Sequence, residues 1–75
     1  MQVNELKIGD KARVVALAKN EKIYRKRLID MGLIPGTEFK VLRMAPLGDP
    51  IEIEVRGFAL SLRKDEATIL TIEEV

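Results

Sequence analysis

The sequence predicts a mainly β fold, a small antiparallel β-barrel of about five short strands with one short α-helix. Its 75 residues include no cysteine, so we expect a single domain over residues 1–75 held together by one apolar core. Glycine and proline divide the chain into short segments, and in most of them the apolar residues alternate as they do in strands. Closing the strands into a barrel removes exposed edges, and an open sheet packed on the helix is the alternative architecture.

The first predicted strand, Ala12 to Ala18, carries apolar residues on both of its faces. In an extended chain Val14 and Ala16 lie on one face, whereas Val15 and Leu17 lie on the other. This pattern predicts a strand that is covered on both sides. A buried helical turn is the competing interpretation for so short a run.

The segment from Glu21 to Met31 has a helical period instead. Tyr24, Leu28 and Met31 fall at positions i, i+4 and i+7 and so share one face of a helix. Asn20 is a residue type suited to the N-cap. We therefore predict a helix over this segment.

Turn signals follow the predicted helix. Gly32 is suited to the positive φ that ends a helix, which places Leu33 where it closes a Schellman motif onto Leu28. The segment Ile34 to Thr37 contains Pro-Gly at its centre, as in a type II turn. The next strand is predicted from Glu38 to Met44.

Three more segments complete the predicted sheet. Ala45 to Pro50 is a loop with two prolines, and Ile51 to Arg56 alternates strictly between apolar and charged residues. After a tight turn, Phe58 to Leu62 continues the alternation as the second strand of a hairpin. Arg63 to Glu66 is predicted to be a polar turn, and Ala67 to Ile72 the last strand.

The composition argues against catalysis and metal binding. Without Cys or His the chain has no disulfide, no Cys/His zinc site, no thiol nucleophile and no imidazole base. Glu52 and Glu54 point to the outer face of one strand, as ordinary surface residues do. We expect no enzyme activity, no cofactor and no metal site, and we interpret four acidic residues near the C-terminus as solvated charge: Asp65, Glu66, Glu73 and Glu74.

One segment is basic although the whole chain is balanced. The chain has 13 basic and 12 acidic residues, yet Lys19 to Arg27 holds five basic residues and one acidic residue. Nucleic-acid binding also needs aromatic rings for stacking, and we assign all three aromatic residues to the core: Tyr24, Phe39 and Phe58. The same assignment argues against a groove for proline-rich peptides. A small RNA-binding barrel remains the alternative function, with the basic helix face as its site: Lys22, Arg25 and Lys26.

Two apolar clusters lie outside the periodic segments and are candidate contacts for a protein partner. A loop residue such as Leu47 either plugs the end of a barrel or anchors a partner. The predicted apolar contacts are Leu33, Ile34 and Pro35 after the helix, and Leu47, Gly48 and Asp49 in the loop. Arg25 and Lys26 are predicted to be rim charges that steer the partner's approach.

Three segments together resemble the FeoA family. Arg27 to Thr37 is similar to its RL-x-x-MG-[LI]-x-PG segment, Ala45 to Ile51 to its AP-x-GDP loop, and Leu60 to Ala67 to its SLR-x-x-EA segment. The resemblance runs in order over essentially the whole chain. It implies an SH3-like β-barrel, which is also similar to the C-terminal domain of iron-dependent repressors. It further implies a small cytoplasmic protein of bacterial ferrous iron uptake, accessory to the membrane transporter FeoB.

Together these inferences predict a non-catalytic cytoplasmic protein that binds the GTP-binding region of a FeoB-type transporter. We expect no nucleic-acid partner, contact with the membrane only through the transporter, and a monomer or weak homo-oligomer. A direct Fe(II) carrier is a further alternative, and the absence of His and Cys argues against it. The longest apolar run, Val14 to Ala18, is too short to span a membrane, and we identify no secretory signal. The chain is therefore expected to be a complete cytoplasmic protein.

Overall fold

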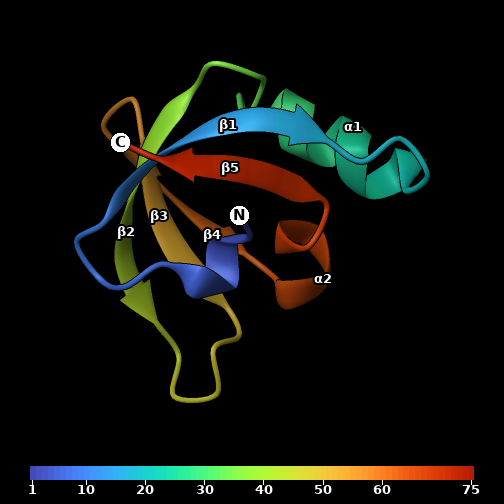
Figure 1. Ribbon diagram of the computed structural model, residues 1–75. Helices are drawn as coiled ribbons and strands as arrows, with labels where there is room; N and C mark the ends of the chain where they lie inside the picture. Colours follow the sequence, from blue (N-terminus) through green and yellow to red (C-terminus); the bar gives the residue numbers. More distant parts are fainter.

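The computed structural model, which describes residues 1–75, contains one curled antiparallel sheet of five strands in the order β4-β3-β2-β1-β5 (Figure 1). The strands β4 and β5 form the two edges, are not hydrogen-bonded to each other, and are connected through the short helix α2. The predicted mainly β, antiparallel architecture is therefore confirmed. The elements are η1 (Val3–Glu5), β1 (Lys11–Leu17), α1 (Lys22–Asp30), β2 (Glu38–Met44), β3 (Ile51–Val55), β4 (Phe58–Leu62), α2 (Lys64–Ala67) and β5 (Leu70–Glu74).

A single apolar core lies inside the curled sheet. Every strand and every helical segment contributes at least one buried side chain to it. The strict alternation of β3 places Ile51, Ile53 and Val55 in this core, as the sequence predicts. Burying a side chain of this size stabilises the fold by about 1.5–3 kcal/mol, so β3 is a main source of stability.

β1 is a strand close to its predicted bounds, but it is covered on one side only. A bulge between Val14 and Ala16 shifts its register against β5. The bulge leaves Val15 at 47% exposure, while Val14 is buried and Leu17 packs against the core. The prediction of two covered faces was wrong because a bulge adds a residue and turns the following side chains to the other face.

The end of α1 follows the prediction. Gly32 has φ +91°, and the N–H of Leu33 donates to the carbonyl of Leu28 over 2.9 Å, the long bond of a Schellman motif. The N-cap prediction was wrong. Glu21 rather than Asn20 occupies that position, and its side chain makes no capping hydrogen bond.

Both predicted turns are present. The N–H of Thr37 donates to the carbonyl of Ile34 over 3.0 Å, and Gly36 has φ +94°, as a type II turn requires. In the β3–β4 hairpin Arg56 and Gly57 both have positive φ, +53° and +85°. Two positive values are typical of the two-residue turns that match the twist of a hairpin.

The core assignment of Phe58 was wrong. Its side chain is 73% exposed, whereas Leu62 at the other end of β4 is fully buried. Phe58 lies beside the hairpin turn and belongs to an edge strand that pairs only with β3. Alternation predicted the correct strand, but the core does not extend to the end of the hairpin.

The chain between the last two strands is helical rather than a polar turn. The N–H of Ala67 donates to the carbonyl of Arg63 over 2.9 Å, which closes one turn of α2. The last strand consequently begins at Leu70 and not at Ala67. A four-residue helix is too short for a periodic pattern to reveal it.

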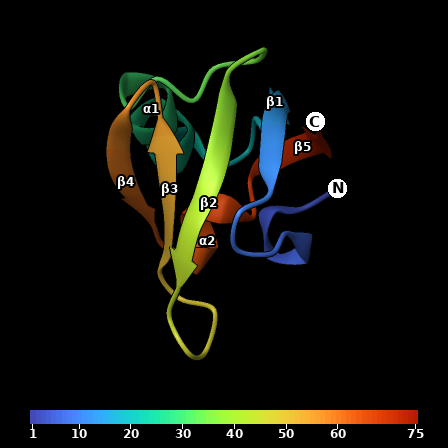
Figure 2. The same cartoon turned by 90° about the vertical axis from the view of Figure 1, so that its left-hand side faces the viewer.

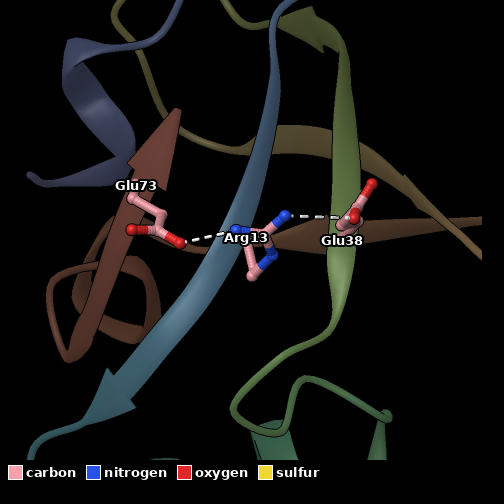
Figure 3. Close-up of polar contacts among 3 residues, drawn as sticks. All are labelled: Arg13, Glu38 and Glu73. Carbon is pink, nitrogen blue, oxygen red and sulfur yellow. Dashed lines mark hydrogen bonds and ion pairs between the residues drawn. The ribbon is translucent and has the colours of Figure 1, made fainter. Parts of the chain in front are cut away.

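Arg13 joins the three strands β5, β1 and β2 on the outer surface (Figure 3). Its guanidinium lies 2.6 Å from Glu73 and 3.5 Å from Glu38. The hydrogen bond to Glu73, and then the bond to Glu38, raise the pKa of Arg13 above its ordinary value. All three side chains are exposed to water, which screens their attraction.

Candidate functional site

The β2–β3 loop presents one apolar side chain to solvent. Leu47 is 94% exposed, so it does not plug the barrel. The base of the loop is fixed, because the N–H of Ala45 donates to the carbonyl of Pro50 over 3.1 Å. Oδ1 of Asp49 accepts a hydrogen bond of 3.0 Å from the backbone N–H of Lys64, which ties the loop to α2. The side chain of Asp49 is therefore engaged within the fold, and Leu47 is the part of the loop that a partner would meet.

A pocket of about 180 Å³ lies beside Leu47. Its walls come from three places: the N-terminal segment, the β2–β3 loop with the start of β3, and α2. Val3, Ile51 and Ala67 contribute apolar wall and are themselves buried. An apolar cavity of about 150 Å³ holds a benzene molecule, so this pocket is large enough for one aromatic or branched side chain. Lys64 is the one charged residue in its lining.

Sequence reasoning missed two walls of this pocket. Val3 belongs to the short turn η1 and Ala67 to the short helix α2, and neither element was predicted. Ala67 is the last residue of the SLR-x-x-EA segment, and that motif does not by itself indicate a pocket wall. Nothing in the first five residues indicates that Val3 is fully buried.

The other predicted apolar cluster lies at the opposite end of β2. Ile34 and Pro35 precede this strand, whereas the loop with Leu47 follows it (Figure 2). A strand of this length spans roughly 20 Å. The two clusters therefore belong to different surfaces and do not form one binding site.

Leu33 is not available to a partner. Its side chain is completely buried and its N–H closes the end of α1. The sequence prediction treated it as part of a surface cluster, but its place in the Schellman motif turns it into the core. Ile34 is 42% exposed, so Ile34 and Pro35 are the residues of this cluster that reach the surface.

Arg25 and Lys26 belong to α1, which lies far from the β2–β3 loop in both views (Figures 1 and 2). Lys26 Nζ lies 2.9 Å from Oδ2 of Asp30, one helical turn later. Arg25 is half-buried, and its Nε has no hydrogen-bond partner. Neither residue is a rim charge for the pocket beside Leu47, where Lys64 has that position.

One buried carboxylate was not predicted. Glu66, interpreted from the sequence as solvated charge, is only 1% exposed. Its Oε1 accepts a hydrogen bond of 3.0 Å from the N–H of Arg63, at the start of α2. Its Oε2 lies 2.9 Å from Nε of Arg27, close enough for an ion pair but without the alignment of a hydrogen bond. The arrangement fixes α1 to α2 and gives Glu66 a structural role.

No three carboxylates lie close enough together to hold a metal ion. No helix is long and apolar enough to cross a membrane. Among the features described, the pocket beside Leu47 is the one with the properties of a protein-binding site: an exposed apolar side chain, an apolar hollow and one cation.

Comparison with known proteins identifies relatives in iron transport. The family model of the FeoA domain matches residues 1–74. The Fe(2+) transport protein A/Fe(2+) transporter FeoB fusion protein of Porphyromonas gingivalis is 33% identical over 73 residues. That match covers 97% of this chain but only 8% of the relative, so the chain corresponds to a small part of that fusion protein.

The solved structures agree with this family. A FeoA-like protein from Clostridium acetobutylicum is 39% identical with a TM-score of 0.90, and the match covers 100% of this chain and 86% of that one. FeoA from Stenotrophomonas maltophilia, described as a prokaryotic SH3 domain protein, has a TM-score of 0.83 at 24% identity, with 97% and 89% of the two chains covered. IdeR from T. acidophilum gives 0.88 at 20% identity, with 100% of this chain and 34% of IdeR covered. The predicted SH3-like fold and its likeness to iron-dependent repressors are thus confirmed.

Proposed function

Since the chain belongs to the FeoA family, which serves ferrous iron transport, we propose that it is a non-catalytic accessory protein that binds a FeoB-type transporter. The fusion protein of Porphyromonas gingivalis supports this proposal, because it joins a FeoA part and a FeoB part in one chain. Fusion raises the effective concentration of one part near the other, which is useful when the two parts act together. The proposed partner surface is the cytoplasmic GTP-binding region, and the proposed location is the cytoplasm.

The observation that carries the proposal is the exposure of Leu47 beside the pocket. A leucine that is 94% exposed contributes almost nothing to the core. It stands on a loop whose base is fixed by two hydrogen bonds, so little conformational entropy is lost when a partner binds. The contacts that dominate a protein interface cluster in well-packed pockets that exclude water, and we propose that the pocket beside Leu47 becomes such a centre when a partner side chain fills it.

The pocket also indicates what the partner contributes. Its volume of about 180 Å³ accepts one aromatic or branched side chain. Lys64 on the lining favours a carboxylate next to that side chain. The proposed docking element is therefore an apolar residue of the transporter beside an acidic residue.

Binding of the chain to the transporter in lipid-free detergent micelles tests this proposal. Leu47→Ala should lower the affinity about tenfold, because truncating a central apolar contact costs more than 1 kcal/mol. Asn4→Trp, a substitution at an exposed position of the pocket lining, should block the pocket and weaken binding at least as much. Phe58→Ala is the matched control, since Phe58 is 73% exposed and lies at the far end of β3.

Two results would contradict the proposal. One is an affinity that Leu47→Ala and Asn4→Trp leave unchanged while the unsubstituted chain binds, because another surface would then carry the interaction. The other is the absence of binding in every nucleotide state of the transporter. We also propose that the free chain is a monomer or weak homo-oligomer. Sedimentation of the chain without the transporter measures this oligomeric state.

A further inference from the structure

The first half of α1 and the residues before it form a patch of positive charge. We call this patch the α1 basic face and define it by four residues: Lys19, Lys22, Arg25 and Lys26. They line an open hollow of about 450 Å³ together with Ile29, and no acidic residue contributes to that lining. Five of the 13 basic residues lie between Lys19 and Arg27, while eleven of the 12 acidic residues lie elsewhere. The near-zero net charge of the chain therefore hides a strongly asymmetric distribution.

The stability of the fold does not explain these charges. The positive end of a helix dipole lies at its N-terminus, where acidic residues are stabilising and basic residues are not. The first turn of α1 contains no acidic residue and begins with Lys22. Only Lys26 has an acidic partner, Asp30, while Nε of Arg25 is buried without any hydrogen-bond partner. The basic residues at the start of α1 therefore gain nothing from the helix dipole, which points to a role outside the fold.

An apolar side chain projects next to the basic face. Ile23 follows Lys22 in the first turn of α1 and is 84% exposed. Ile23 lines one open hollow with Lys22 and another with Lys26, and Glu21 and Asp30 also contribute to these hollows. An exposed isoleucine next to lysines has the composition of a peripheral membrane contact, in which cations attract anionic headgroups and the apolar residue enters the interface.

We propose that the α1 basic face and Ile23 bind the anionic surface of a lipid bilayer. The bound chemistry is the phosphate of the lipid headgroups, held by several cations at once. Nucleic acid is the less suitable anion, because no aromatic residue contributes to the basic face and base stacking needs exposed rings. The contact differs from the sequence prediction that the chain meets the membrane only through its partner.

The position of the basic face fits this role. Both views place α1 at one end of the molecule and the β2–β3 loop with Leu47 at the other (Figures 1 and 2). The end of the molecule that carries α1 is therefore free to lie on lipid while the end that carries the β2–β3 loop contacts protein. The biological use of this contact rests on the proposed function, in which the partner is a membrane transporter, but the contact itself does not require the transporter.

Co-sedimentation with vesicles that contain no protein tests the proposal. The chain should bind vesicles of phosphatidylcholine mixed with phosphatidylglycerol, should bind pure phosphatidylcholine weakly, and should lose binding as salt is raised. Each basic residue near an anionic membrane contributes roughly a fivefold increase in affinity, so the triple variant Lys19→Gln, Lys22→Gln, Lys26→Gln should bind roughly a hundredfold more weakly. Ile23→Ala should weaken binding severalfold and without a change in salt dependence.

The matched control removes the same charge elsewhere: Lys7→Gln, Lys11→Gln, Lys40→Gln. These three side chains are exposed, have no ion-pair partner, and lie outside α1. The control should keep most of the vesicle binding, and both triple variants should keep the circular dichroism spectrum of the unsubstituted chain. Equal losses in the two triple variants would overturn the proposal, because net charge alone would then explain the binding.

Two further arms exclude other anions. Free glycerol phosphate should not displace the chain from vesicles. A single phosphate contacts few of the basic residues, whereas the lipid surface contacts all of them at once. A single-stranded RNA oligonucleotide at matched phosphate concentration should bind more weakly than the anionic vesicles. Tighter binding of the RNA, or equal sedimentation with both kinds of vesicle, would overturn the proposal. Because no transporter is present, these results do not depend on the outcome of the experiment with FeoB.

Discussion

Nε of Arg27 lies 2.9 Å from Oε2 of Glu66, and this ion pair joins α1 to α2. The Glu66 side chain is 2% exposed, whereas the Arg27 side chain remains 61% exposed. The two residues belong to separate sequence motifs that are far apart along the chain. Their contact joins the two motifs and attaches the helix α1 to the connection between the two edge strands.

The first prediction concerns this ion pair. Arg27→Ala should lower the free energy of unfolding by about 1–3 kcal/mol, because the buried carboxylate of Glu66 then lacks a compensating charge. Urea denaturation measures this difference. Arg43→Ala is the control, since its ion pair with Glu52 is exposed and longer, at 3.6 Å. That control should change the stability by about 1 kcal/mol or less, and equal effects of the two substitutions would show that the hydrogen bond from Arg63 alone stabilises Glu66.

The second prediction separates the two leucines that the sequence treats alike. Leu33→Ala should destabilise the fold by about 2–5 kcal/mol, because Leu33 is completely buried and its loss leaves a cavity. Leu47→Ala should leave the melting temperature nearly unchanged, because Leu47 is 94% exposed. Thermal unfolding followed by circular dichroism compares the two variants. A large destabilisation by Leu47→Ala would show that the loop folds back onto the pocket in solution.

The third prediction concerns the end of α1. Gly32 has φ +91°, and a Cβ placed there would meet Nη1 of Arg56 at 3.5 Å, an ordinary contact. The cost of a substitution therefore comes from the backbone conformation rather than from crowding. Gly32→Val should cost more than the roughly 1–2 kcal/mol typical of a left-handed residue, because a β-branched side chain fits positive φ poorly.

Gly32→Asn is the control for that variant, since asparagine tolerates positive φ better than other residues with a side chain. It should lie between the unsubstituted chain and Gly32→Val in chemical denaturation. Equal stability of all three proteins would mean that the helix does not end in this conformation.

The fourth prediction concerns Arg13 and the strands that it joins. Its raised pKa means that the stability contributed by its charge is complete below the unfolded-state pKa and is lost only as pH rises through the folded-state pKa. Both values are strongly alkaline, so Arg13→Gln should lower stability by the same small amount at neutral and at mildly alkaline pH. Added salt should shrink the difference, because Arg13, Glu38 and Glu73 are exposed. A difference that salt does not change would indicate that Arg13 acts through packing instead.

Local signals in the sequence predicted much of the fold. The strand β2 has the predicted bounds, and the helix ends at Gly32 as expected, because glycine, proline and strict alternation act on neighbouring residues. Errors arose where distant parts of the chain decide the outcome. The exposure of Val15 depends on a bulge against β5, and the burial of Glu66 depends on α2.

The candidate site was predicted in part for the same reason. Leu47 lacks a periodic reason to be buried, so its exposure was one of two readings that the sequence allowed. The pocket beside Leu47 could not be predicted from the sequence, because its walls come from three segments that are far apart along the chain: the N-terminal segment, the loop and α2. The distance between Leu47 and Ile34 also follows only from the fold, which places them at opposite ends of β2.

An amide-shift titration of the labelled chain with the cytoplasmic GTP-binding region of FeoB, in the apo, GDP and GTP-analogue forms, locates the docking site on this chain. We predict shifts around the pocket, at Val3, Leu47, Gly48 and Ala67, in at least one nucleotide state. The amides of Arg25 and Ile34 at the other end of the molecule should remain unchanged. Shifts confined to α1 and Ile34, or no shifts in any nucleotide state, would contradict the claim that the pocket beside Leu47 is the docking site for the transporter.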